Sequence, residues 1–100
     1  MPEVMRVQTG VRMEAALLKV LKALAAYKNL GLGDLLEGIC LHALEGRAPF
    51  ARDTIEQIAR LKQIYGLTLT ATDSHRLTES RISRPPRAGA KAPVRPRYRS

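Results

Sequence analysis

The chain has 100 residues, a hydrophobic fraction of 45%, a formal net charge of +8 and a single cysteine. One cysteine excludes a disulfide framework and a multi-cysteine zinc site. No apolar run approaches the roughly 20 residues that span a bilayer, and the N-terminus has no apolar region of the signal-peptide type. We therefore expect one small cytoplasmic protein with no membrane segment, metal or cofactor.

The positive charge is concentrated toward the C-terminus. Residues 1–75 hold nine Lys/Arg against eight Asp/Glu, a balance of +1, whereas residues 76–100 hold eight against one, a balance of +7. Proline is frequent in the same stretch, so residues 74–100 are predicted to form a disordered basic tail. This asymmetry indicates a polyanionic partner, either a nucleic acid or an acidic surface.

Residues 5–13 alternate in polarity, which predicts a half-buried strand. One side holds Met5, Val7, Thr9, Val11 and Met13, and the other holds Arg6, Gln8, Gly10 and Arg12. No second strand of comparable quality lies nearby in the sequence, so the backbone groups of this strand need a partner elsewhere. An unpaired apolar strand edge is a template for pairing with another chain.

Helical spacing of apolar residues predicts helices over 14–28 and 34–44 and a third that ends near residue 65. Asp53, with Glu56 three residues later, is typical of a capping box at the start of the third helix. Asn29 or Gly31 can end the first helix. Residues 67–72 alternate again, either as a short edge strand or as an extended segment over the third helix.

One strand and two helices make a thin core, and chains near 40 residues seldom fold unaided. Antiparallel pairing of the strands of two copies, with their helices packed together, would complete both the strand and the core. We therefore expect an obligate, symmetric homodimer, with or without further assembly on a partner. The expected organisation is a dimerising unit over 1–47, a third helix and extended segment over 48–73, and the tail from 74.

The first half of the chain resembles the ribbon-helix-helix repressors of the Arc/MetJ type, and QTGVRM (residues 8–13) is similar to their ribbon. The resemblance implies a mainly α dimer whose two-stranded ribbon enters the major groove of DNA. It places Gln8 and Arg12 at base-reading positions. Two features depart from the family: Gly10 has no side chain at the middle reading position, and the second helix opens with Gly33 and Asp34 instead of Ser or Thr.

The candidate base-reading residues are Arg6, Gln8 and Arg12. Arginine can donate two hydrogen bonds to guanine, and glutamine can pair with adenine. A symmetric dimer would present each residue twice, which favours a two-fold symmetric pair of half-sites. The alternative is an ordinary solvated strand face, which any one-sided ribbon would have.

Two further groups are candidates for contacts to DNA phosphates. The backbone N–H groups of Leu32, Gly33 and Asp34 begin the second helix, where an anion is favoured, although the Asp34 carboxylate would repel it. The tail would add salt-sensitive, sequence-independent affinity, or else serve solubility or an acidic protein partner. Its basic residues are Arg81, Arg84, Arg87, Lys91, Arg95, Arg97 and Arg99.

These features predict a DNA-binding transcriptional regulator and not an enzyme. Cys40 and His42 are two residues apart on a helix, so they point to different faces and make a poor metal pair. One alternative is a protein-interaction module, such as an antitoxin-like protein that binds a partner through its third helix or tail. Another is an accessory protein that coats DNA without sequence preference.

Overall fold

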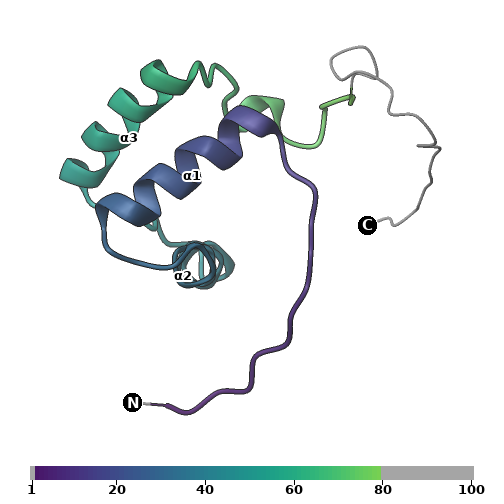
Figure 1. Cartoon of the computed structure of the whole chain (residues 1–100), viewed down its shortest axis with the longest axis vertical. Helices are drawn as coiled ribbons and strands as arrows, with labels where there is room; N and C mark the ends of the chain where they lie inside the picture. Colours follow the sequence, from purple (N-terminus) through teal and green to yellow (C-terminus); the bar gives the residue numbers. More distant parts are fainter. Residues whose placement is uncertain (1, 80–100) are drawn as a thin grey trace. The chain divides into compact units, whose positions relative to one another are not determined.

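The computed structural model describes residues 2–79, and this part of the chain is mainly helical, as expected (Figure 1). Its elements are α1 (Ala15–Tyr27), α2 (Leu32–Leu44), α3 (Arg52–Tyr65) and the short 3₁₀ helix η1 (Ala71–Asp73). Each predicted helix is therefore present, with ends that differ by a few residues from those expected.

Local signals explain both ends of α1. The Glu14 carboxylate accepts a hydrogen bond of 2.8 Å from the backbone N–H of Leu17, so Glu14 precedes the helix as its cap. At the other end, Asn29 takes a left-handed conformation with φ of 58°. Of the two residues that the sequence offered for this stop, the structure uses Asn29, whose short polar side chain tolerates that conformation.

α2 begins two residues earlier than predicted, at Leu32, because extended backbone at Gly31 starts the helix without a side-chain cap. Asp34 consequently lies inside the first turn, where a carboxylate interacts favourably with the helix dipole. The helix ends at Leu44, as predicted.

The predicted capping box at the start of α3 is wrong. Ala51 precedes this helix and provides no side-chain cap, while Asp53 lies in the first turn and accepts a 2.8 Å hydrogen bond from the adjacent Thr54 N–H. An acidic residue in the first turn still stabilises the helix through its favourable interaction with the helix dipole. The predicted end near residue 65 is confirmed: α3 ends at Tyr65, and Gly66 then takes the left-handed conformation with φ of 71°.

Residues 67–72 are not assigned to a strand in the described chain. Leu67 packs against the hydrophobic core instead. Farther along, the Thr70 N–H donates to the Asp73 carboxylate over 2.9 Å and closes a capping box around η1. The residues of the alternating pattern thus have two different roles: Leu67 contacts the core, and Thr70 caps a short helical turn.

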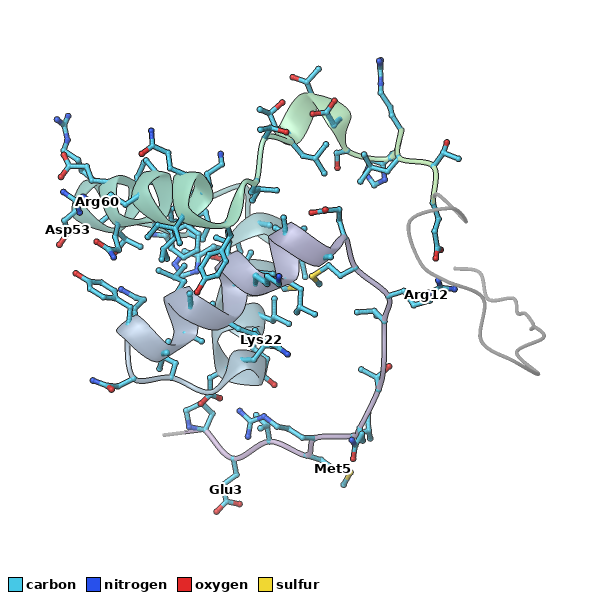
Figure 2. All side chains as sticks on the ribbon, turned by 45° about the horizontal axis from the view of Figure 1, so that its top comes forward. Glu3, Met5, Arg12, Lys22, Asp53 and Arg60 are labelled. Atoms are coloured by element: carbon cyan, nitrogen blue, oxygen red, sulfur yellow. The ribbon has the colours of Figure 1, made fainter. Side chains whose placement is uncertain are left out.

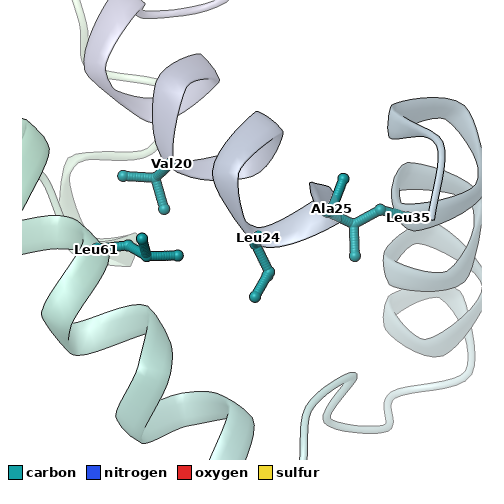
Figure 3. Close-up of a cluster of buried hydrophobic side chains, with 5 residues drawn as sticks. All are labelled: Val20, Leu24, Ala25, Leu35 and Leu61. Carbon is teal, nitrogen blue, oxygen red and sulfur yellow. The ribbon is translucent and has the colours of Figure 1, made fainter. Parts of the chain in front are cut away.

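α1 is the central helix and contacts both α2 and α3 (Figure 1). The buried apolar side chains come from all three helices and meet around Leu24, which is only 1% exposed (Figure 3). They are Val20, Leu24, Ala25, Leu35 and Leu61. Within residues 2–79, these few enclosed side chains make a small core.

The third helix shares this core and does not form a separate layer. Leu61 belongs to the buried cluster, and the Lys28 ammonium donates to the buried Thr54 hydroxyl over 3.3 Å, which links the end of α1 to the start of α3. The chain accordingly divides into one compact unit over Met1–Thr68 and a second that begins at Leu69. α3 belongs to the first of these units because it packs on α1.

Substituting Gly38 by alanine tests whether this one position lies in a tight contact between copies. A Cβ atom at Gly38 would meet nothing within 4 Å in the described chain, and glycine inside a helix costs about 1 kcal/mol relative to alanine. Gly38→Ala is therefore expected to raise the free energy of unfolding by about 1 kcal/mol in chemical denaturation. A loss of stability that deepens as the protein is diluted would instead place Gly38 in a tight contact between copies.

Candidate nucleic-acid interface

The N-terminal segment, residues 2–12, leaves α1 as a long irregular stretch in which every residue is exposed (Figure 1). Glu3 and Met5 project away from the helices (Figure 2). A ribbon needs hydrogen bonds from a second strand, and the described chain offers none to this segment. The predicted strand and its pairing between subunits therefore stay a prediction.

The apolar side of the predicted strand is open to solvent. Met5 is 90% exposed, and Val7 and Val11 are also largely exposed. Met13, at the start of the helical region, is half-buried. Alternate apolar side chains without cover are expected of a strand that completes its packing only when another chain is present.

The C-terminal half of α2 is exposed as well. Leu41 and Leu44 face solvent, and so does Cys40. Leu35 and Ile39 are one turn apart and pack toward α1. Each further residue turns about 100° around the helix, so Cys40 points away from that contact.

Among the three candidate base readers, Arg6 has a defined partner on α2. Its guanidinium donates from Nε to Glu37 Oε2 over 2.9 Å and from Nη2 to Glu37 Oε1 over 2.8 Å. The Asp34 carboxylate lies 3.7 Å from the same Nη2. The contact between Arg6 and Glu37 is a two-point ion pair, which is stronger and more directional than a single hydrogen bond.

This ion pair shifts both titrations. The hydrogen bond from Arg6, with its charge, lowers the pKa of Glu37 below its ordinary value of 4.5, and the same contact raises the pKa of Arg6. A carboxyl group whose pKa is lowered by folding stabilises the folded chain at pH values above its ordinary pKa. That contribution is lost as the pH falls through the lowered value.

We expect the Glu37 carboxyl of the folded protein to titrate below its ordinary value of 4.5. An acid titration followed by carbon NMR of the side-chain carboxyl groups measures its pKa. Arg6→Gln should return the pKa of Glu37 toward 4.5. A titration of Glu37 that Arg6→Gln does not move would contradict the ion pair.

Gln8, Gly10 and Arg12 are all exposed on the same segment as Arg6. A Cβ atom at Gly10 would meet nothing within 4 Å, so the missing side chain at the middle position is not required by contacts within this copy. The structure thus leaves Gln8 and Arg12 on the outside, where the predicted function needs them.

The candidate phosphate site lies at the start of α2. The bonding of the helix begins with Leu35, whose N–H donates to Gly31 O over 3.1 Å, so the N–H groups of Leu32, Gly33 and Asp34 precede the regular ladder. Leu32 is half-buried, and the other two residues are exposed. The Asp34 carboxylate faces the Arg6 guanidinium, which reduces its repulsion of an anion.

The predicted phosphate-binding residues of the tail, Arg81 to Arg99, lie outside the described residues.

No protein-family model, curated protein or solved structure matches the chain. The resemblance to the ribbon-helix-helix repressors therefore still rests on the residues that suggested it.

None of the helices in residues 2–79 has both the length and the apolar character to cross a membrane. In the same residues, no group of three or more His, Cys, Asp or Glu side chains is arranged to hold a metal ion.

The sequence did not predict the partner of Arg6. Asp34 and Glu37 are three residues apart, so they share a helix face, and this spacing is visible in the sequence. The sequence does not show which basic side chain contacts them, because Arg6 lies 31 residues from Glu37.

Proposed function

We propose that the chain is a DNA-binding transcriptional regulator that acts in the cytoplasm as a homodimer and has no catalytic role. In the dimer, residues 5–13 of two copies pair as an antiparallel ribbon that enters the major groove. The observation that carries this proposal is the exposure of the alternating apolar residues Met5, Val7 and Val11 on a segment with no helix of its own.

Burial of apolar surface supplies the reason to dimerise. Besides the N-terminal segment, α2 exposes Leu41 and Leu44, the latter to 84%, beside a core of only a few enclosed side chains. Burying such side chains in a second copy contributes about 25 cal/mol for each Å² removed from water. A symmetric pairing covers both surfaces with a single arrangement.

Base recognition would come from the polar side of the ribbon. Arg6 and Arg12 suit guanine, and Gln8 suits adenine. The N–H groups at the start of α2 would position the dimer on a phosphate of the same duplex. Since the dimer repeats this set about its axis, the proposal predicts a two-fold symmetric binding site.

The basic residues 81–99 would add contacts to phosphates without reading sequence. Each phosphate that a lysine or arginine neutralises releases counterions, so the affinity falls as salt rises. Removing these residues should flatten the salt dependence of binding and leave the preference for one sequence over another largely unchanged.

A partner-binding role for the third helix has less support. α3 supplies Leu61 to the core, so it packs on its own chain. Its exposed residues Ile55 and Ile64 are nine positions apart, which places them on opposite sides of the helix and not along one apolar stripe. We therefore propose DNA binding ahead of a protein partner of the antitoxin type.

The test begins by sizing the free protein in solution. A duplex enriched from a random-sequence library is then titrated against a scrambled duplex of the same length, at two salt concentrations. The proposal expects a dimer that prefers the enriched duplex at both concentrations. A monomer, or equal affinity for both duplexes, would overturn it, and equal affinity would favour the role as a DNA-coating protein.

A further inference from the structure

Arg6 cannot contact Glu37 and a DNA base at the same time. In the proposed complex its guanidinium faces a base in the major groove, but in the described chain Nε and Nη2 are both engaged by Glu37. A carboxylate and the edge of a guanine present similar pairs of acceptors to an arginine fork. Glu37 therefore occupies donors that DNA could use.

The position of the carboxylates adds to this competition. Asp34 and Glu37 lie on α2, the second element proposed to approach DNA, and both are within ion-pair distance of Arg6 Nη2, at 3.7 and 2.8 Å. While they hold Arg6, its charge is offset by two neighbouring negative charges. They also tie the exposed N-terminal segment to its own chain, away from the extended pairing that a ribbon requires.

We propose that Glu37, assisted by Asp34, is an intrachain latch that holds Arg6 on α2 and restrains the N-terminal segment until DNA displaces it. This inference rests on the proposed function, because it concerns the availability of the same ribbon for DNA. The latch acts by competition: the protein exchanges a carboxylate for a base at Arg6 when it binds.

The exposure of the pair makes the latch reversible. The side chains of Arg6 and Glu37 retain 62% and 49% of their accessible surface, so water and salt screen their attraction. Exposed ion pairs are weak, and a contact of this strength should reduce DNA affinity only by about two- to fivefold. Such a latch lowers the fraction of DNA sites that the protein occupies but does not abolish binding.

The decisive variant is Glu37→Gln, which removes the charge and keeps the size of the side chain. We expect it to bind the enriched duplex about two- to fivefold more tightly than the wild type. The matched control is Glu45→Gln, which makes the same charge change at the other end of the same helix, where the nearest basic partner is Arg47 at 3.6 Å. It should bind like the wild type.

The gain must also depend on Arg6. In an Arg6→Gln background, Glu37→Gln should no longer improve the affinity for the enriched duplex, because there is no Arg6 guanidinium for the substitution to release. A gain that persists in this background would show that Glu37 acts only as a nearby negative charge, and it would overturn the latch.

The free protein provides a readout without DNA. The Nε–H of Arg6 should show slowed proton exchange in NMR, which Glu37→Gln removes and Glu45→Gln retains. An Arg6 Nε–H that exchanges at the same rate in all three proteins would overturn the latch.

The Arg12→Ala variant separates failure of the latch from failure of the proposed function. If Arg12→Ala weakens binding to the enriched duplex but Glu37→Gln gives no gain, only the latch is wrong. If Arg12→Ala and Arg6→Ala both leave binding unchanged, the ribbon does not read DNA and the latch falls with it.

Discussion

Replacing Leu24 with alanine is expected to lower the free energy of unfolding by about 2–5 kcal/mol. Leu24 is 1% exposed and lies at the meeting point of the three helices (Figure 3). Its truncation removes buried apolar surface and leaves a cavity that rigid helices fill only partly. In a core with so few enclosed side chains, this loss is a large share of the total stability.

Chemical denaturation at one fixed protein concentration measures this effect, because the stability of a dimer depends on concentration. The matched control is Leu77→Ala, which makes the same truncation at a side chain that is 56% exposed. The control should change the unfolding free energy by no more than about 0.5 kcal/mol. Equal losses at the two positions would mean that Leu24 does not lie at the centre of the core.

Arg12→Ala is expected to weaken binding to the enriched duplex by about 1–3 kcal/mol, which is the discrimination carried by one good two-point contact to a base. Binding to a scrambled duplex should change less, since that affinity comes from phosphates. The proposed dimer would carry Arg12 twice, so the substitution would affect both half-sites. Titration of each duplex at the same salt concentration gives the comparison.

Arg60→Ala is the control for the loss of a positive charge. Arg60 lies on α3, away from the N-terminal segment (Figure 2), and donates to Gln57 over 2.9 Å on its own helix. Its replacement should lower the affinity for both duplexes slightly and equally. If Arg12→Ala behaves like Arg60→Ala, then Arg12 provides charge and does not read a base.

The helices could be located from the sequence because their signals are local. Apolar residues three and four positions apart place α1, α2 and α3, and α3 ends at Tyr65, near the predicted residue. The start of α3 was misplaced because Asp53 and Glu56 satisfy the spacing of a capping box, whereas the helix begins one residue before Asp53. Spacing alone does not distinguish a cap from an acidic first turn.

The candidate site was predictable only in part. Alternation over residues 5–13 places Gln8 and Arg12 outward on an exposed segment, as the structure also has them. Pairing of that segment needs a second copy, so the ribbon remains to be tested by the sizing and binding experiments. No pattern in the sequence predicted that Arg6 would pair with Glu37.

We could predict the mainly helical composition, the approximate helix ends and the uneven charge from the sequence, since each depends on residues that are neighbours along the chain. Two contacts became visible only in the folded chain: Leu61 of α3 packs into the core of α1, and Arg6 lies against Glu37 and Asp34. Contacts of this kind depend on how the turns orient whole helices. Side chains that are 31 residues apart can then meet in a way that no local pattern specifies.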